Sequence, residues 1–485
     1  MKRLLLILVF LSFCWASIAQ DFDEWRRQQQ QEWSKCKDVQ QQKWADFREK
    51  LNKEYAEKMG RQWSSCKVSP AIPVPSRPEP PTPVIKKNAA PAPTCAVTVK
   101  EYVKPTVCEQ PQPFQPIARP INEPAAAYTF NFHQTPCKVH VNEGMAFALP
   151  NVSENTVSAA WQRLSSSGYD LVADDCLNYR EQLELNDWGY IELTKTLAGD
   201  FLGQNTNESV LMQAYLLVQS GYKVRLARSE GRLVLMMPFA TDIYKYAYLL
   251  LDGEKFYLLD NDEEGSSYYV FNENFKGEKT ASLELRKEPR FFDTPTLPKT
   301  FVSSYNPETT TNISTNQNLI DFYNSCPVTS NWRDYAKASL SKKIKWELYP
   351  VLKKQIAGKT EEEAANILLN FVQTAFAYKT DQEQFGYERP LFGDEMFYYP
   401  YSDCEDRSIL FTILIHDLLH LDVVMLEYPG HLATAVRFSQ DVAGYYVMMN
   451  EAKYVVCDPT YIGASVGECM PQFQNTAAAT IVVYE

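Results

Sequence analysis

The chain has 485 residues, of which 45% are hydrophobic and 13% aromatic, and its formal net charge is −12. This length exceeds one ordinary core, so two or three domains are expected, with ample apolar material for packed interiors. The acidic balance argues against binding of nucleic acid, because phosphate recognition needs a basic surface.

Residues 1–19 have the three parts of a secretory signal peptide. A basic start is followed by an apolar run from Leu4 to Phe13 and by a small-x-small cleavage site ending at Ala19. Lipidation at Cys14 is the alternative, and the bulky Phe13 before it disfavours that reading. No later run is long and apolar enough to span a bilayer. The mature chain is therefore expected to be periplasmic, on the cell surface or secreted.

Export would place the protein where disulfides persist. Ten of the 11 cysteines remain after cleavage. Cys95 with Cys108, and Cys457 with Cys469, are close enough in sequence to form bridges. The connectivity stays open, because sequence alone does not determine it.

Residues 20–66 are expected to form a charged helix with an aromatic stripe. An eleven-residue recurrence is a helical period typical of coiled-coil-like segments. The helix is either solvated and alone or docked on a partner, and both alternatives stay open. The partner would be another copy of the chain or a component of the cell envelope. The stripe consists of Phe22, Trp25, Trp33, Trp44 and Phe47.

Residues 67–127 hold more than half of the chain's 29 prolines. Such a composition favours extended polyproline conformations and predicts a stiff linker. This linker would hold the globular part of the protein away from the N-terminal helix.

From residue 128 onward the composition is globular, and the chain repeats itself. An offset of 199 aligns residues 209–212 with 408–411, and residues 222–226 with 421–425. An offset of 198 then aligns residues 255–260 with 453–458. A helix and two strands thus recur in the same order, which predicts two related domains, residues 128–300 and residues 301–485.

Three evenly spaced motifs in the second domain look like the corners of a catalytic triad. Cys404 precedes an apolar run with helical spacing, residues 409–419, whereas His431 and Asp458 lie in segments with strand character. Cys404 and His431 are 27 positions apart, and so are His431 and Asp458. A thiol at a helix N-terminus would then face an imidazole and a carboxylate on neighbouring strands. These are a nucleophile, a base and a group that orients the base.

Two features around the Cys404 thiol have opposite effects on the stability of its thiolate form. The positive end of the helix dipole favours the thiolate, whereas the neighbouring acids Asp403, Glu405 and Asp406 oppose it. His431 is therefore expected to contribute most of the activation. The backbone amide of Cys404 is one natural donor to an oxyanion, because the first amides of a helix have no intrahelical partner.

The second oxyanion donor stays open among Tyr378, Tyr398 and Tyr399. No cofactor or metal ion is expected. His416 and His420 have the i, i+4 spacing of a zinc-binding pair, but no glutamate between them supplies a base, and a solvated helix face explains them better.

The first copy lacks most of the triad. Asn205 stands at the position of the cysteine, and Arg232 or Leu233 stands at that of the histidine, while Asp260 matches the aspartate. We therefore expect residues 128–300 to form a degenerate, catalytically inactive copy.

At these residues the chain resembles the transglutaminase-like superfamily, in particular its bacterial secreted members. The resemblance covers residues 330–485 well, and the first copy only in degenerate form. It implies an α+β fold of the papain type, in which the cysteine helix packs on an antiparallel sheet. By resemblance Cys404 is the nucleophile, His431 the base and Asp458 the orienting acid. The motifs that carry it are residues 378–381, 384–389, 403–408, 429–431 and 457–461.

Members of this superfamily include peptidases, amidases, deamidases and cross-linking enzymes. The expected function is a secreted cysteine-dependent acyl transfer on amide bonds of peptides, proteins or the cell wall. Hydrolysis is favoured over transamidation, because no second substrate site is evident. The alternative is a non-catalytic exported binding or scaffold protein that keeps a remnant triad.

Overall fold

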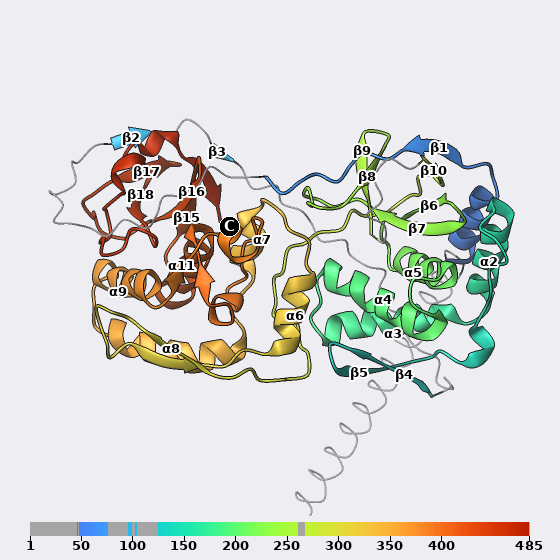
Figure 1. Cartoon of the computed structure of the whole chain (residues 1–485), viewed down its shortest axis with the longest axis horizontal. Helices are drawn as coiled ribbons and strands as arrows, with labels where there is room; N and C mark the ends of the chain where they lie inside the picture. Colours follow the sequence, from blue (N-terminus) through green and yellow to red (C-terminus); the bar gives the residue numbers. More distant parts are fainter. Residues whose placement is uncertain are drawn as a thin grey trace, which may run out of the picture.

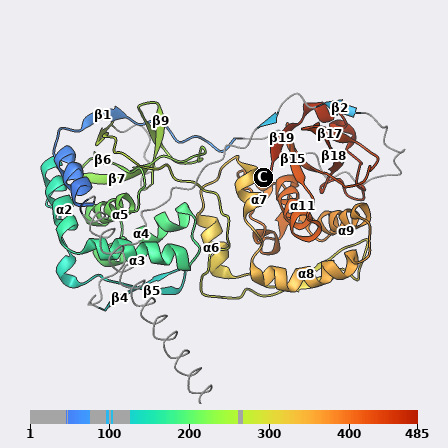
Figure 2. The same ribbon diagram turned by 180° about the vertical axis from the view of Figure 1, so that it is seen from behind.

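The structure is a computed structural model that describes residues 46, 48–75, 125–259 and 267–484, together with the backbone of residues 96–98 and 102–103. The expected signal peptide and the five aromatic residues of the N-terminal stripe lie outside these residues. Two lobes lie side by side, and each places a sheet over a layer of helices (Figures 1 and 2). No helix in the described ranges is long and apolar enough to cross a membrane.

From residue 128 the first lobe has a β-hairpin and then four helices. Side chains cap the helix starts, as when Thr206 accepts a hydrogen bond from the amide of Ser209. α5 is buried along most of its length and lies beneath the sheet. The elements are β4 (Tyr128–Phe132), β5 (Thr135–Val139), α2 (Glu154–Ser166), α3 (Tyr169–Gln182), α4 (Asp187–Leu202) and α5 (Asn207–Gln219).

The sheet of the first lobe is antiparallel, with the strand order β1-β10-β6-β7-β9-β8. Its strands are β1 (Ser64–Lys67), β6 (Arg225–Ser229), β7 (Arg232–Met237), β8 (Tyr248–Leu251), β9 (Glu254–Leu258) and β10 (Ser267–Val270).

The second lobe places helices beneath a seven-stranded sheet. The sheet has the order β2-β17-β18-β16-β15-β19-β3, and its five central strands are antiparallel. The helical layer comprises α6 (Gln317–Ser325), α7 (Trp332–Lys337), α8 (Lys342–Ile356), α9 (Glu361–Thr374), α10 (Asp381–Gln384) and α11 (Cys404–Leu419). The strands of the sheet are β2 (Ala96–Thr98), β3 (Tyr102–Val103), β15 (Val423–Tyr428), β16 (His431–Val436), β17 (Tyr446–Met449), β18 (Ala452–Cys457) and β19 (Thr480–Val483). Two small sheets complete it, formed by β11 (Lys299–Val302) with β12 (Thr310–Ile313) and by β13 (Ala377–Tyr378) with β14 (Tyr401–Ser402).

The described parts of the two lobes share one topology. A buried helix, α5 or α11, is followed by five strands in each lobe. Their order is β8-β9-β7-β6-β10 in the first lobe and β17-β18-β16-β15-β19 in the second. The class is therefore α+β, as expected, and the helix-then-strands order expected of both halves is present in both.

The correspondence extends to the pairing register. Tyr248 pairs with Tyr257 in the first lobe, and the residues 198 positions later, Tyr446 and Val455, pair in the second. Side chains alternate between the two faces of a sheet, so equal registers at a constant offset place equivalent side chains on the same face.

The N-terminal helix packs on the protein's own first lobe, whereas the alternatives considered were a lone helix and a helix docked on a separate partner. A helix at residues 48–59 packs against the first lobe, and β1 joins its sheet beside β10. The ring of Tyr55 is 1% exposed and stacks between Trp161 and Phe275, with centroid distances of 5.1 Å and 3.6 Å. The ring of Tyr55 is thus buried within the chain, because the neighbouring lobe covers its apolar surface.

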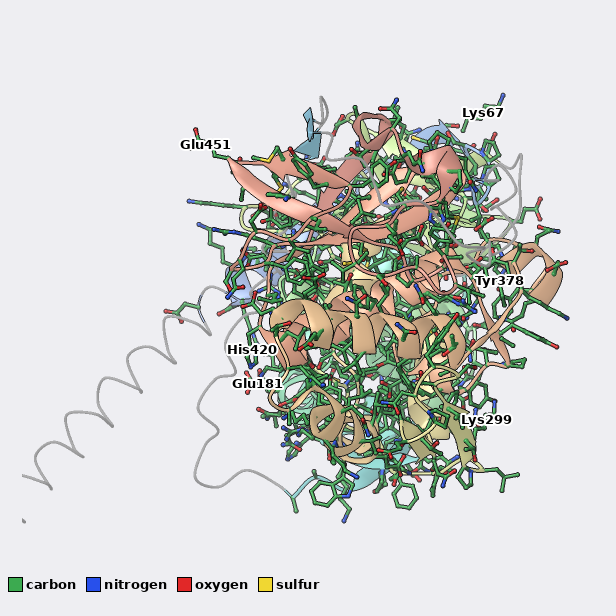
Figure 3. All side chains as sticks on the ribbon, turned by 90° about the vertical axis from the view of Figure 1, so that its left-hand side faces the viewer. Lys67, Glu181, Lys299, Tyr378, His420 and Glu451 are labelled. Carbon is green, nitrogen blue, oxygen red and sulfur yellow. The ribbon has the colours of Figure 1, made fainter. Side chains whose placement is uncertain are left out.

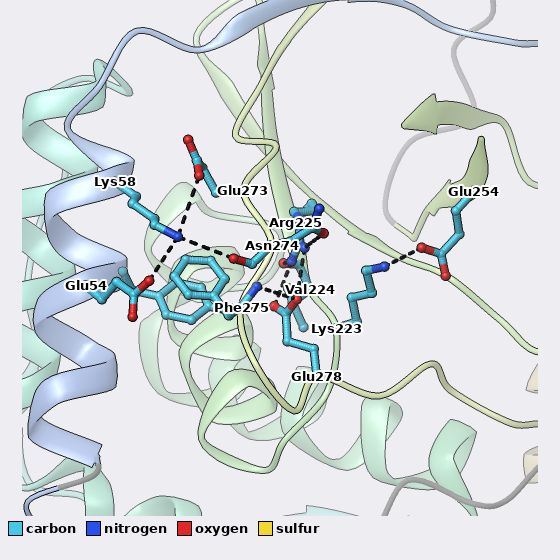
Figure 4. Close-up of polar contacts among 11 residues, drawn as sticks. Glu54, Lys58, Lys223, Val224, Arg225, Glu254, Glu273, Asn274, Phe275 and Glu278 are labelled. Atoms are coloured by element: carbon cyan, nitrogen blue, oxygen red, sulfur yellow. Dashed lines mark hydrogen bonds and ion pairs between the residues drawn. The ribbon is translucent and has the colours of Figure 1, made fainter. Parts of the chain in front are cut away.

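Polar contacts hold this helix in place (Figure 4). The hydroxyl of Tyr55 donates to Oε1 of Glu278 at 2.7 Å, and Arg225 donates to both carboxylate oxygens of Glu278. Lys58 lies 3.6 Å from Glu273. Contacts with the first lobe continue past residue 66, where Ser69 pairs with Tyr248 and the carbonyl of Ile72 accepts from the amide of Lys245.

The proline-rich segment is also more than a spacer. β2 lies parallel to β17 at one edge of the second sheet, and β3 lies parallel to β19 at the other edge. Residues 98 and 102 are at most about 14 Å apart, because an extended chain spans about 3.5 Å per residue. The two edges therefore approach each other, and the sheet is strongly curled.

Candidate active site

Cys404 is the first residue of α11, and Asp403 is its N-cap. A hydrogen bond of 3.2 Å from the backbone amide of Asp403 to Oδ2 of Asp406 stabilises this cap. The thiol is buried, with 1% of the residue exposed. The expected position of the cysteine at a helix N-terminus is confirmed.

His431 and Asp458 form a buried pair. Nε2 of His431 lies 3.0 Å from Oδ2 of Asp458, and neither side chain is exposed. His431 begins β16, and Asp458 directly follows β18, the neighbouring strand. A carboxylate only accepts hydrogen bonds, so Nε2 of His431 is the donor in this pair.

The second oxygen of Asp458 is held by the backbone. Oδ1 accepts from the amides of Thr460 at 2.9 Å and Tyr461 at 3.2 Å. This is an Asx-type turn, which explains the Asp-Pro-Thr sequence after the strand. The turn fixes the carboxylate in the orientation that reaches His431.

The start of α11 lies against the start of β16. Oγ of Ser408 donates to the carbonyl oxygen of Leu432 at 2.8 Å. Cys404 precedes Ser408 by one helical turn, on the same helix face, and His431 directly precedes Leu432. The hydrogen bond thus brings the cysteine and the histidine to the same end of the helix–sheet interface.

The thiol and the imidazole are not hydrogen-bonded to each other in this conformation. Sγ of Cys404 donates to Oε2 of Glu405 at 3.1 Å. Nδ1 of His431 is buried and makes no hydrogen bond with any described residue. The ring of Phe473 stacks on His431 with a centroid distance of 4.6 Å and covers one face of the imidazole.

Buried carboxyl groups surround the start of α11. Burial and the charges of Asp406 and Glu405 raise the pKa of Asp381 to about 10. Burial and the charge of Glu405 raise the pKa of Asp406 to about 8. The pKa of Asp403 is raised well above its usual range by burial and by the same acids. The opposing acids expected from the sequence are therefore present, and Asp381 joins them from α10.

Gln373, at the end of α9, holds the loop after Asp458 and has no counterpart among the expected site residues. Its Nε2 lies 3.1 Å from the carbonyl of Asp458, 2.8 Å from that of Tyr461 and 3.1 Å from that of Ala464. The side chain is 1% exposed. Nothing in the sequence marks this glutamine, because its partners are 85 or more positions away.

Arg407 is the second residue that sequence reasoning missed. Its guanidinium is fully buried and donates to the carbonyls of Gln373 and Phe376 and to Oγ of Ser402. It joins the start of α11 to the end of α9. The arginine lies within the cysteine motif, but only the fold shows which carbonyls it binds.

Tyr378 stands out among the three tyrosines considered as oxyanion donors. β13 pairs with β14 so that Tyr378 is opposite Ser402, two residues before the cysteine. Its hydroxyl is buried and has no hydrogen-bond partner among the described residues. Burial and the charge of Cys404 raise its pKa, so the hydroxyl stays protonated as a donor. The hydroxyl of Tyr399 is instead committed to Asn324 at 2.7 Å.

His416 and His420 do not belong to this site. His420 is the C-cap of α11 and has a left-handed backbone conformation, with φ of 55°. Figure 3 shows Tyr378 and His420 on opposite sides of the second lobe. The two histidines are thus separated from the triad by the length of the helix.

Cys457 and Cys469 are free thiols, so the bridge considered between them is wrong. Sγ of Cys469 instead donates to the carbonyl oxygen of Phe473 at 3.0 Å. Cys95 and Cys108 lie outside the described residues.

The first lobe has different groups at the corresponding positions. Arg232 pairs with Ser229 as His431 pairs with Tyr428, so Arg232 rather than Leu233 is the register equivalent of the histidine. Asn205 precedes α5 and has φ of 56°, so it is not helical as Cys404 is. Asp260 lies outside the described residues.

No family model matches the chain, and neither a curated protein nor a solved structure is similar to it.

Proposed function

We propose that this protein is a cysteine-dependent acyl-transfer enzyme that hydrolyses amide bonds in peptides, proteins or the cell wall. The observation that carries the proposal is the buried His431–Asp458 pair, 3.0 Å apart, at the strand end that faces the start of α11. Three positions separated by equal intervals in sequence converge there on a helix and two adjacent strands. A thiol, an imidazole and a carboxylate are the three groups that nucleophilic catalysis by a thiol commonly uses.

The proposed reaction begins when Nδ1 of His431 takes the proton of the Cys404 thiol. The thiolate attacks the amide carbon, and the C–N bond breaks as the imidazolium gives its proton to the leaving nitrogen. A thioester remains on Cys404. Water then attacks the thioester, with His431 as base, and the acid product leaves as the thiol is protonated again. Asp458 stabilises the imidazolium in both halves of the reaction.

The first step requires the thiol to leave Glu405. Rotation about the Cα–Cβ bond of Cys404 exchanges one staggered position of Sγ for another and costs little. In the proposed reaction this rotation brings Sγ from Glu405 to Nδ1 of His431.

The developing oxyanion needs donors at its oxygen. The backbone amide of Cys404 is at a helix start, where amides lack intrahelical partners. The hydroxyl of Tyr378 is the proposed second donor, since it is buried, protonated and without another hydrogen bond.

A second candidate function is a binding or scaffold protein with a remnant triad. It is favoured by the burial of the site, because Cys404, His431 and Asp458 are each at most 1% exposed. It differs from the first proposal in predicting no turnover under any condition.

Two further proposals concern the origin of the two lobes and the export of the protein. The shared strand order and register support an origin of the two lobes by duplication, with the first lobe as a copy that has lost the thiol and the imidazole.

The signal-like residues 1–19 support export. N-terminal sequencing of the mature protein from its host tests this, and a start at Met1 contradicts it.

Profiling of a peptide and peptidoglycan-fragment library tests the function. We expect cleavage by the wild type, none by Cys404→Ala, and a loss of about 10⁴-fold in kcat for Asp458→Asn. Asp422→Asn is the matched control, because Asp422 is half exposed and pairs with Arg437 at the surface. A labelled amine added to the assay separates hydrolysis from transamidation. Cleavage that survives Cys404→Ala, or its complete absence in the wild type, contradicts the proposal.

A further inference from the structure

Large apolar side chains are exposed to solvent along one part of the second lobe. Trp346 on α8 is 82% exposed, Leu297 is 88% exposed and Phe292 is 57% exposed. Single exposed apolar residues are common, whereas several together on one surface indicate a site of interaction. The positions of these three side chains therefore decide whether they form such a surface.

Phe292 lies beside the first turns of α8. The carboxylate of Asp293, the next residue along the chain, lies 3.2 Å from Nζ of Lys343. Trp346 follows Lys343 by three positions, which places the two side chains on one face of the helix. The exposed rings of Phe292 and Trp346 therefore flank the ion pair between Lys343 and Asp293.

Leu297 is held near the same part of the helix. Its neighbour Thr296 donates its amide to the carbonyl oxygen of Thr315 at 2.9 Å, and the two threonine hydroxyls are 3.0 Å apart. The amide of Ser314, one residue earlier, donates to Oε2 of Glu347 at 3.0 Å. Glu347 directly follows the exposed tryptophan, so Leu297 lies close to the helix turn that carries this tryptophan.

α8 adds positive charge to this surface. The helix contains five lysines and one glutamate, and its buried residues include Ile344, Leu348 and Leu352 on the side that faces the lobe. Lys353 and Lys354 are exposed, and within the described part of the chain neither forms an ion pair. We call the exposed surface the α8 face, and it consists of Phe292, Leu297, Lys342, Trp346, Lys353 and Lys354.

The α8 face lies at the outer margin of the second lobe. α8 runs along the side of the helical layer that is remote from the seven-stranded sheet (Figures 1 and 2). The candidate active site lies instead where the start of α11 meets β16. A partner at the α8 face would therefore leave the candidate active site uncovered.

We propose that the α8 face docks the protein on the surface of an anionic lipid bilayer. Tryptophan prefers the boundary between headgroups and acyl chains, and exposed leucine and phenylalanine side chains can insert beside it. The neighbouring lysines attract anionic headgroups. Charges act across water over only about 8–10 Å at physiological salt, so the acidic balance of the whole chain does not cancel this local attraction. The inference does not rest on the proposed catalytic function.

A second copy of the chain fits the α8 face less well. A symmetric dimer brings the same surface of both subunits together. The lysines of one subunit would then lie opposite those of the other, and the nearby acids Asp293 and Glu347 already have partners within the chain. Anionic headgroups supply the opposite charge that this surface lacks.

Co-sedimentation of the protein purified from its host with lipid vesicles tests the proposal. We expect binding to vesicles of phosphatidylcholine with phosphatidylglycerol, little binding to phosphatidylcholine alone, and weaker binding as the salt concentration rises. Trp346→Ala and the double variant Lys353→Gln/Lys354→Gln should each reduce the affinity about tenfold. All three side chains are on the surface, and circular dichroism checks that each variant folds.

Leu250→Ala and the double variant Lys67→Gln/Lys276→Gln are the matched controls. Leu250 is 60% exposed but belongs to β8 of the first lobe, and Lys67 and Lys276 are exposed lysines of that lobe. Figure 3 shows Lys67 at the opposite end of the molecule from Lys299, which follows Leu297 by two positions. Both control proteins should bind vesicles as the wild type does.

Vesicles with brominated acyl chains provide a second measurement, because bromine quenches the fluorescence of a tryptophan that enters the bilayer. Binding should quench part of the fluorescence of the wild type. Trp346→Phe should remove that quenched part and still bind, since phenylalanine also inserts.

Four results would overturn the proposal. The first is no binding of the wild type to the anionic vesicles, and the second is equal binding to neutral vesicles. The third is binding or quenching that is unchanged in the Trp346 and lysine variants, which would assign attachment to another segment. The fourth is a dimer that Trp346→Ala dissociates in the absence of vesicle binding, which would assign the α8 face to a second copy.

Discussion

At the residue scale, the site is distinguished by which polar atoms have partners and which do not. His431 has one nitrogen bonded to Asp458 and the other without a hydrogen bond, as a base awaiting a proton requires. Residue type and spacing were enough to predict the contact between His431 and Asp458. The side chains of Cys404, His431 and Asp458 are themselves the thiol, imidazole and carboxylate that the proposed chemistry needs. Gln373 could not be predicted, since an ordinary helical glutamine gains its role only from the distant carbonyls that it meets.

Tyr378→Phe removes a single hydroxyl and tests the assignment of the second oxyanion donor. We expect kcat to fall about 10²-fold with little change in KM, because the hydrogen bond is made mainly in the transition state. Steady-state kinetics on the best library peptide measure this. Tyr399→Phe is the control, as its hydroxyl already binds Asn324. Equal kinetics for Tyr378→Phe and the wild type would remove Tyr378 from the mechanism.

At the element scale, the strongly patterned segments were predictable and the short ones were not. The apolar run after Cys404 forms α11, and the segments containing His431 and preceding Asp458 form β16 and β18. β2 and β3 are three and two residues long, too short to show a period of two. The helix at residues 48–59 was expected, but a stripe of apolar residues does not reveal that its partner is the chain's own first lobe.

Tyr55→Ala tests the docking of this helix. The ring is buried between two aromatic side chains, so its loss should lower the free energy of unfolding by about 3–5 kcal/mol. Urea denaturation measures the loss, and limited proteolysis should show earlier cleavage near residues 48–59. Lys53→Ala, on the exposed face of the same helix, should change little. A Tyr55→Ala protein as stable as the wild type would mean that the helix is not part of the folded lobe.

Asp394, just before the turn at Glu395–Phe397, provides a pH-dependent term in stability. Burial raises its pKa to about 7, with a smaller contribution from the charge of Glu288. The folded state thus favours the neutral acid. The stabilising contribution of neutral Asp394 to the free energy of unfolding is therefore present in full below pH 4 and is lost as the pH rises through 7. Asp394→Asn should therefore be more stable than the wild type at pH 8, by about 4 kcal/mol at most, and equal to it at pH 4. A difference that does not depend on pH would contradict this assignment.

At the scale of the whole molecule, two lobes with one topology carry unequal chemistry. The register equivalence of Arg232 and His431 shows that the same frame can hold a basic surface residue or a buried imidazole. The sequence repeat predicted this arrangement, because the helix and strand patterns recur in both halves even though different residues stand at the triad positions. The course of the chain between the lobes was not predictable, since residues 96–98 and 102–103 join the second sheet through backbone pairing.

The central claim is that His431 activates Cys404, and the rate of alkylation of Cys404 by iodoacetamide tests it most directly. The rate is measured across pH by mass spectrometry of the modified peptide in the wild type, His431→Ala and Arg232→Ala. We predict that Cys404 in the native protein reacts faster at pH 7 than in the unfolded protein, that His431→Ala abolishes this advantage, and that Arg232→Ala preserves it. A native Cys404 that reacts no faster than in the unfolded chain, or a rate unaffected by His431→Ala, would contradict the account.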